Sequence, residues 1–316
     1  MAANTFAQAI TGNPAAFLEA LAPDVFLEAV FLVQPIKGSD NVKAVLEAAR
    51  ELYTSYKVTD KATKGAKTYL DWTGEWADGF VLQGVTILTV ENDKITNIAV
   101  HHRPLGTAIA LSKELKKRLP QLADHFWADW KSAGEKAYPP TGYPVYDSYS
   151  HITEGNVEDQ AWTNSFSAKS GEEFAKALHP DLKFQAAAIT HTVWGVDKAQ
   201  QILHQASNFY QNLVFDHEVR NDTNRRYIEW KLSGFDGMAM RGLTTLQIDD
   251  EGRIAELNIY HRPLGGSAWL SKELNKRLTE AGRPDVADHF WKGDDETQTI
   301  KEAYESGKAL KDKGLV

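Results

Sequence analysis

Apolar and polar residues alternate along the chain with two different periods, and these periods predict an order of helices and strands. Apolar residues recur every three to four positions over residues 41–53, which predicts an amphipathic helix. Residues 67–76 and 80–90 are β-prone runs on either side of Asp78-Gly79, a dipeptide typical of a two-residue hairpin loop. The other elements expected here are two short helices over 6–21, strands over 25–31, 56–63 and 95–102, and a basic helix over 111–119.

The same order of sequence patterns then occurs a second time along the chain. His102 to Gly106 reads His-Arg-Pro-Leu-Gly, and so does His261 to Gly265. The blocks Leu-Ser-Lys-Glu-Leu and Ala-Asp-His-Phe-Trp follow both copies in the same order. Matching blocks in one order indicate a tandem duplication. A period this long indicates two globular domains and not a solenoid, whose repeats run roughly 20–50 residues.

The duplication also predicts the domain boundaries. We expect a first domain over residues 1–130, a linker rich in Pro and Tyr over 131–160, a second domain over 161–292 and a charged helical tail over 293–316. Each domain begins with helices and continues with long strands. This order is typical of an α+β fold, in which a curved antiparallel sheet carries helices on its concave side.

Composition narrows the classes of function. The chain has 316 residues and no cysteine, which excludes disulfides, thiol catalysis and cysteine-ligated zinc. The formal net charge is −8 and no basic face stands out, so we expect no nucleic-acid partner. The chain lacks a long apolar stretch and a signal-peptide pattern, so we expect a cytoplasmic protein without a membrane segment. We find no metal-ligand spacing and no phosphate-binding glycine loop, and therefore expect chemistry without a metal or cofactor.

The element order, with a final strand of the form Ile-x-x-Leu-x-Ile-x-x-Arg-Pro, resembles the SnoaL-like branch of the NTF2-like (cystatin-like cone) superfamily. The resemblance covers nearly all of both halves. It implies a cone that encloses an apolar pocket between the sheet and the helices. It implies no single activity, because the superfamily contains isomerases, dehydratases, epoxide hydrolases, polyketide cyclases and plain binding domains.

Alternation along the strands predicts which side chains face each pocket. His102 and His261 lie on the face of the last strand that lines the pocket in ketosteroid isomerases, which look similar here. A two-residue hairpin loop would pair Asp71 with Thr86, and directly opposed residues share a face of the sheet. The residues expected in the two pockets are Tyr69, Asp71, Thr86 and His102 in the first, and Tyr227, Glu229, Thr244 and His261 in the second.

The departures from the isomerases bear on the predicted chemistry. Their general base lies where this chain has Ala29 and Ala186, and their oxyanion-binding Asp lies where it has Thr86 and Thr244. Isomerase chemistry of that kind is therefore not expected. The remaining His, carboxylate and Tyr more nearly resemble the functional groups of scytalone dehydratase.

The predicted function is that of a lyase without a cofactor. It would dehydrate a small, largely apolar, oxygenated substrate, an aromatic one included, or cleave a C–C bond in it. His261 or His102 would move the proton, Glu229 or Asp71 would orient the imidazole, and a Tyr or Thr would hold the oxygen.

Two alternatives remain open. An epoxide-type hydrolase or an isomerase could use the same pocket, with Asp71 or Glu229 activating water in the hydrolase. A protein without catalysis could bind a hydrophobic ligand there. Each residue also has a structural interpretation, because a His can be held by local hydrogen bonds, a carboxylate can form an ion pair, and the Arg after each His can bridge to a carboxylate at the edge of the sheet.

The copies differ at a position that bears on activity. His191 has a glutamine as its counterpart, so we expect His191 to bind substrate in the second pocket. We therefore expect His261→Ala to abolish turnover more completely than His102→Ala. His125 and His289 are interpreted as packing residues, because an adjacent Asp and His point in different directions on a helix.

The outer faces of the sheets are too apolar to face water. We expect the two halves to pack sheet to sheet as an internal pseudo-dimer, with a small hydrophobic molecule as the partner and further homo-oligomers left open. The residues expected on the outer faces are Leu70, Trp72, Val85 and Ile87, together with His101 and Tyr260.

Overall fold

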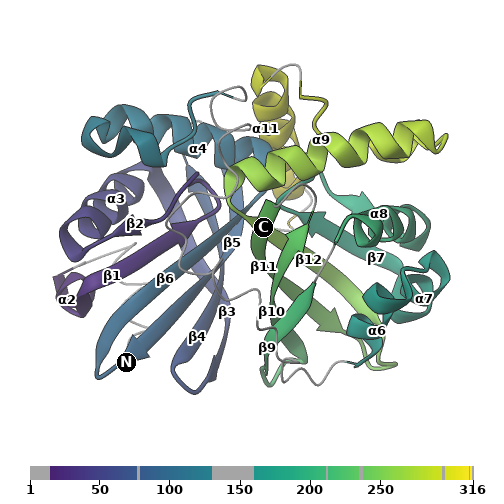
Figure 1. Cartoon of the computed structure of the whole chain (residues 1–316), viewed down its shortest axis with the longest axis horizontal. Coiled ribbons are helices and arrows are strands. Elements are labelled where there is room, and N and C mark those ends of the chain that lie inside the picture. The colour runs from purple at the N-terminus through teal and green to yellow at the C-terminus, as the bar shows by residue number, and fades with distance from the viewer. Residues whose placement is uncertain are drawn as a thin grey trace.

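The computed structural model of the chain contains two halves that lie side by side, each built on one sheet (Figure 1). It describes residues 15–76, 79–129, 160–210, 213–234, 238–293, 296–312 and 314. The predicted linker over 131–160 therefore lies almost wholly outside the described residues, as does the first of the two expected N-terminal helices. The domain boundaries stay predictions.

The first half is a six-stranded sheet of order β2-β1-β6-β5-β4-β3 with helices over one face. Neighbouring strands run antiparallel except β1 and β6, which run parallel, so the sheet is mixed and not wholly antiparallel. Its elements are α2 Ala15–Glu19, β1 Leu21–Ala29, β2 Ile36–Lys37, α3 Ser39–Leu52, β3 Tyr53–Lys64, β4 Lys67–Trp76, β5 Phe80–Glu91, β6 Lys94–Arg103, α4 Leu105–Arg118 and the 3-10 helix η1 Pro120–His125.

The second half repeats this topology, with the order β8-β7-β12-β11-β10-β9 and a parallel pair β7·β12. The predicted α+β class is confirmed for both halves. The elements are α6 Gln160–Ala168, α7 Gly171–Ala177, β7 Leu178–Ala186, β8 Val193–Trp194, α8 Val196–Phe209, β9 Val214–Arg220, β10 Arg225–Gly234, β11 Met238–Ile248, β12 Ile254–Arg262, α9 Leu264–Glu280, α10 Pro284–Ala287 and α11 Glu296–Asp312.

Local sequence explains how the helices meet the sheet. The apolar stripe of α3 buries Val42, Val45, Ala49 and Leu52 in the core of the first half. Pro104 and Pro263 each end the last strand of a half and stand at the N-cap of the next helix. Proline has no N–H to give to the ladder, and its fixed φ suits a helix start. The helix after each Arg-Pro therefore begins several residues earlier than the apolar pattern predicts. No helix among the described residues has the length and apolar character to span a membrane.

The long hairpin of each half has a three-residue loop, and the predicted two-residue loop is wrong. Trp76 pairs with Phe80, and Gly234 pairs with Met238. Asp78 and residues 235–237 lie outside the described residues, so the conformation of the Asp-Gly turns is not described. The strand pairing alone shows that the loop has three residues, and one extra loop residue shifts the register of the hairpin by one position.

The shift changes which residues share a face. Asp71 pairs with Val85 instead of Thr86, and Glu229 pairs with Leu243 instead of Thr244. A slip of one residue moves every side chain of a strand to the other face. Leu70 and Trp72, expected on the outer face, therefore lie in the core under the helices. Val85 and Ile87 lie on the outer face as predicted.

The outer faces of the two sheets pack against each other. One buried apolar cluster contains residues of both sheets, and tyrosines at its centre touch across the junction, with the ring centroids of Tyr69 and Tyr227 5.3 Å apart. His101 and Tyr260 also face this junction, and their ring centroids lie 5.7 Å apart. The cluster is made of Ala62, Tyr69, Val85, Ile87, Ala99, Val219, Tyr227, Leu243 and Tyr260.

The last helix, α11, follows the second half in sequence but packs on the first half. It lies above the junction of the two halves, beside α4 (Figure 1). Gly106 of α4 permits the approach, because a Cβ there would lie 2.1 Å from the carbonyl oxygen of Thr299. At the other end of α11, the Lys311 Nζ lies 2.8 Å from a carboxylate oxygen of Glu75. The tail therefore ties the two halves together.

Candidate functional site

Each half buries a histidine–tyrosine pair under its helices. The Nε2 of His102 lies 3.1 Å from the hydroxyl of Tyr53, and the Nε2 of His261 lies 2.9 Å from the hydroxyl of Tyr210. Each tyrosine directly follows a helix, α3 or α8, so the helix end meets the last strand of the sheet at this pair. Both histidines face the helix-covered side, as the alternation along the last strand predicts.

A glycine beside each histidine lets a tryptophan close over it. In the second half Gly242 pairs with both Trp230 and His261, so it stands between them on the sheet. A Cβ at Gly242 would lie 1.9 Å from the Cζ2 of Trp230. Without it, the Trp230 ring reaches the imidazole edge-on, with centroids 5.2 Å apart. The first half repeats this arrangement around Gly84.

Burial holds both imidazoles neutral. It lowers the pKa of His102 to about 3 and that of His261 to about 3. Burial also raises the pKa values of Tyr53 and Tyr210 well above that of a free phenol. The structure gives these imidazoles tyrosine and tryptophan neighbours, and no carboxylate among the described residues lies within ion-pair distance of either. At neutral pH each pair is thus an uncharged hydrogen-bonded unit.

Thr86 and Thr244 lie on the same helix-covered faces and each binds a tryptophan. The Nε1 of Trp72 donates to the hydroxyl of Thr86 at 3.1 Å. The Nε1 of Trp230 donates to the hydroxyl of Thr244 at 3.2 Å. Both threonines are buried, and these bonds fix the rings that cover the histidines.

Sequence reasoning missed Tyr53 and Tyr210. Both stand at the same place in the repeat, at the end of the amphipathic helix. That repetition was the available signal. It did not reveal the contact with histidine, because the pair forms between segments 49 and 51 residues apart.

A pocket opens at the mouth of the second half, beside its histidine–tyrosine pair. We call it the mouth pocket. Its volume is about 550 Å³, and Tyr210 forms part of the wall that separates it from His261. It is lined by Thr163, Phe166, Ser167, Lys169, Ser207, Tyr210, Leu213 and Phe215. The four apolar or aromatic side chains and the hydroxyl-bearing ones come from α6, α8 and the region around β9.

Asp71 lies at the junction of the halves, so its predicted place in the first pocket is wrong. Its carboxylate accepts hydrogen bonds from Arg225 and, at 2.8 Å, from the hydroxyl of Tyr227. Tyr227 therefore faces the junction too, and not the second pocket. Burial, and then the charge of Asp71, raise the pKa of Tyr227. The physical reason for the error is the three-residue hairpin loop, which turns residue 71 to the outer face.

Glu229 makes the corresponding contacts on the other side of the junction, and its predicted place in the second pocket is wrong for the same reason. Lys67 of the first half donates to both carboxylate oxygens, at 2.7 and 2.9 Å, and Tyr69 donates to one of them. Burial disfavours the charged carboxylate, but Lys67 and Tyr69 outweigh it, so the pKa of Glu229 lies below its usual value. Tyr69 thus also lies outside the first pocket, and burial beside Glu229 raises the pKa of its hydroxyl.

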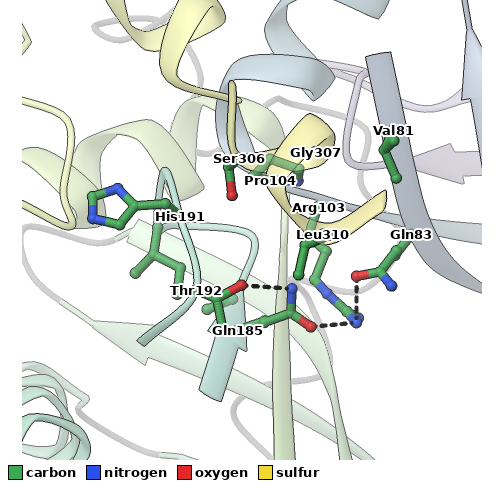
Figure 2. Close-up of a pocket in the computed structure, with 12 residues that line it drawn as sticks. Val81, Gln83, Arg103, Pro104, Gln185, His191, Thr192, Ser306, Gly307 and Leu310 are labelled. Carbon is green, nitrogen blue, oxygen red and sulfur yellow. Dashed lines mark hydrogen bonds between the residues drawn. The ribbon is translucent and has the colours of Figure 1, made fainter. Parts of the chain in front are cut away.

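His191 lies in a third place and not in a pocket with His261, so that prediction is also wrong. It lines a cavity between the halves, whose volume is about 20 Å³. Figure 2 shows this cavity beneath α11. The ring centroid of His191 lies 4.1 Å from that of His289, and burial beside His191 lowers the pKa of His289 to about 4. His289 therefore packs, as interpreted from the sequence. Within the described residues, no group of three or more His, Cys, Asp or Glu side chains is placed to hold a metal ion.

No family model matches the sequence, and no curated protein matches it. Solved structures are similar to parts of the chain. A steroid delta-isomerase from Pseudomonas aeruginosa is 19% identical, with a TM-score of 0.36, over 40% of this chain and 98% of that chain. An uncharacterized protein with a cystatin-like fold from Silicibacter pomeroyi is 19% identical, with a TM-score of 0.35, over 43% of this chain and 94% of that chain. A putative polyketide cyclase from Sinorhizobium meliloti is 15% identical, with a TM-score of 0.28, over 31% of this chain and 91% of that chain.

Each of these similarities covers less than half of this chain, at a TM-score below 0.5. The resemblance to NTF2-like proteins therefore stays a prediction. It does not extend to chemistry, because proteins of one fold carry out unrelated functions.

Proposed function

We propose that the second half binds a small, largely apolar molecule in the mouth pocket. The observation that carries the proposal is the pocket itself, whose volume of about 550 Å³ lies in the range of roughly 300–1,000 Å³ found for small-molecule sites. Phe166, Leu213 and Phe215 offer apolar surface, and Tyr210 adds an aromatic ring. Such a site stabilises a ligand chiefly by removing its apolar surface from water.

The polar side chains in the lining of the mouth pocket indicate that the ligand also has a polar group. Thr163, Ser167 and Ser207 provide hydroxyl groups, and the exposed Lys169 places a positive charge at the rim. A few polar groups in an apolar pocket fix the orientation of a ligand. The molecule that fits is therefore an oxygenated ring compound, with its ring against Phe166 and Phe215 and its oxygen near the rim.

Binding accounts for the site better than the predicted lyase. That mechanism needs a carboxylate and an imidazole on one face, and Glu229 lies at the junction instead. The hydrolase alternative loses its water-activating carboxylate for the same reason. A general acid or base works best when its pKa lies near the operating pH. His261, with a pKa of about 3, and Tyr210, with a raised pKa, both fail that condition.

Titration calorimetry with 1-naphthol, a neutral oxygenated aromatic, tests the proposal. Thr163→Trp should fill the mouth pocket and abolish binding. Phe215→Ala should weaken binding about 10-fold, because it removes roughly 1–2 kcal/mol of apolar contact. Trp194→Ala is the matched control, since Trp194 is an aromatic residue 48% exposed on β8, outside the pocket lining.

Two results would count against binding at this site. If Thr163→Trp and Phe215→Ala bind 1-naphthol as the unmodified protein does, the mouth pocket is not the site. If the protein converts an oxygenated aromatic and His261→Asn stops the conversion while Glu229→Gln leaves it unchanged, the pair His261–Tyr210 is catalytic and the proposal of binding alone fails.

A further inference from the structure

The duplication places two equivalent arginines at the junction, and their partners differ. Arg262 donates to a carboxylate oxygen of Glu28 at 2.7 Å, and both side chains are 4% exposed. Arg103 stands at the same place in the first copy, and Gln185 stands at the place of Glu28. One arginine thus has a carboxylate where the other has a neutral amide.

Arg103 is bound by neutral oxygens. Its Nη2 donates to the Oε1 atoms of Gln83, at 3.0 Å, and Gln185, at 2.9 Å (Figure 2), and its Nη1 donates to the hydroxyl of Tyr260. The residue is 5% exposed, and its Nε is buried without a hydrogen-bond partner. Among the described residues, no carboxylate lies within ion-pair distance of Arg103.

A buried guanidinium that is bound only by neutral oxygens raises the free energy of the folded state. Arginine stays protonated in proteins, so it cannot relieve the cost by losing its proton. A buried charge needs an opposite charge as well as hydrogen bonds. Glu28 supplies the opposite charge for Arg262. Among the described residues, no carboxylate lies within ion-pair distance of Arg103, and its buried Nε has no hydrogen-bond partner.

Arg103 lines a cleft that could hold the missing charge. We call it the interface cleft. Its volume is about 540 Å³, and it lies at the junction of the two halves. It shares no lining residue with the mouth pocket. Its lining includes Asp71, Gln83, Arg103, Lys183, Arg225, Glu256 and Tyr260.

The other buried cations of the interface cleft already have carboxylates. Lys183 lies 3.6 Å from Glu256, and Arg225 lies 3.6 Å from Glu256 and in contact with Asp71. Of the buried and half-buried cations described in the lining, Arg103 alone has no such partner. The whole lining carries four cations and three carboxylates, a formal excess of one positive charge: Lys57, Arg103, Lys183 and Arg225 against Asp60, Asp71 and Glu256.

We propose that the interface cleft binds a small organic carboxylate, whose carboxylate group pairs with Arg103. Nε and Nη2 lie on one edge of the guanidinium and suit two parallel hydrogen bonds to a carboxylate. The ligand would replace one glutamine oxygen on Nη2. Gln185 would keep its own hydrogen bond to Thr192, at 3.1 Å.

The charged residues of the interface cleft favour a ligand that carries one negative charge. Asp71 and Glu256 line the same cleft, and nearby cations hold the pKa of Glu256 at about 2 in spite of burial, so it is ionised at neutral pH. A doubly charged anion such as phosphate would meet their repulsion. A monocarboxylate neutralises Arg103 and adds no further charge.

Thermal unfolding in sodium acetate and sodium benzoate, against sodium chloride at equal ionic strength, tests the proposal. A ligand that binds only the folded state raises the melting temperature. We expect a rise of about 2 °C at saturation in the unmodified protein. Gln185→Glu places a carboxylate where the second copy has Glu28, so it should raise the melting temperature in chloride and abolish the response to acetate. Arg103→Gln should abolish the response as well.

The second arginine gives a matched control within the same molecule. Glu28→Gln leaves Arg262 without its carboxylate, but Arg262 lines neither the interface cleft nor the mouth pocket. This variant should therefore respond to acetate only as much as the unmodified protein does. Equal responses in the unmodified protein, Gln185→Glu and Arg103→Gln would show a general salt effect and overturn the proposal. So would the absence of any response, or a larger response to phosphate than to acetate. Gln185→Glu keeps the test decisive if Arg103→Gln does not fold.

Discussion

Glu229 and His261 lie on opposite faces of one sheet. Glu229 pairs with Leu243 and Leu243 with Tyr260, so these three share the face at the junction. His261 pairs with Gly242 and faces the helices. The carboxylate holds the halves together, and the imidazole lies under the helices. The two groups therefore cannot cooperate on one substrate in this fold.

Acid should destabilise the protein through its buried histidines. The pKa of His261 is about 3 in the folded protein, against about 6.5 for a histidine in an unfolded chain. Between these values the unfolded state binds a proton that the folded state does not, so the free energy of unfolding falls as pH falls from 6.5 toward 3. The slope is about 1.4 kcal/mol per pH unit for each such imidazole. His261→Phe should flatten the pH dependence of unfolding by that amount, measured by urea unfolding at pH 7, 6, 5 and 4.

The control for this experiment is Trp194→Ala, which changes an exposed aromatic residue and no titratable group. Its slope between pH 6.5 and 4 should stay close to that of the unmodified protein. If His261→Phe and the unmodified protein lose stability with the same slope, His261 is not held neutral by burial.

The hydrogen bond between Tyr210 and His261 should contribute to stability as a pair. Tyr210→Phe leaves the Nε2 of His261 buried without its partner, and His261→Phe leaves the hydroxyl of Tyr210 in the same condition. Each change should cost about 1–3 kcal/mol in the free energy of unfolding at pH 7. The double change should cost less than the sum, with a coupling of about 1 kcal/mol. Strict additivity in urea unfolding would show that the two groups do not interact.

Much of the fold was predictable because it depends on local patterns. The duplicated Arg-Pro at the end of the last strand fixes the inward orientation of His102 and His261, since side chains alternate along a strand. The amphipathic stripe of α3 and the two runs of the long hairpin are also local. Each of these features follows from a few neighbouring residues.

The candidate site was harder to predict because it depends on loop length and on distant contacts. A single extra residue in the hairpin loop turns Asp71 and Glu229 away from the histidines. The place of His191 depends on α11, which reaches over from the end of the chain to cover its cavity. Tyr53 meets His102 only when the helix end and the last strand come together. Local periodicity describes none of these relationships.

The two ion pairs across the junction should differ in strength. Asp71 and Arg225 have side chains 8% and 11% exposed, whereas Lys67, the partner of Glu229, is 32% exposed. Asp71→Ala leaves the buried guanidinium of Arg225 with only the more distant Glu256, at 3.6 Å, and leaves the hydroxyl of Tyr227 without its acceptor. It should cost about 3–5 kcal/mol in the free energy of unfolding. Glu229→Ala leaves a lysine that water can reach, so the cost should be about 1–2 kcal/mol. Urea unfolding of both variants tests the order, and a larger loss for Glu229→Ala would contradict it.

Gly242 should be intolerant of even one methyl group. A Cβ there would lie 1.9 Å from the Cζ2 of Trp230 and 2.2 Å from the carbonyl oxygen of Tyr260, so the ring that covers His261 has to move. Overpacking of this kind costs about 1–3 kcal/mol, and more where backbone is in the way. Gly242→Ala should therefore lower the free energy of unfolding by at least about 2 kcal/mol and change the binding of 1-naphthol in the mouth pocket. Gly171→Ala, whose Cβ would lie 3.8 Å from its nearest neighbour, should instead be neutral or stabilising by up to about 1 kcal/mol. Equal stabilities of the two variants would mean that Trp230 does not lie against Gly242.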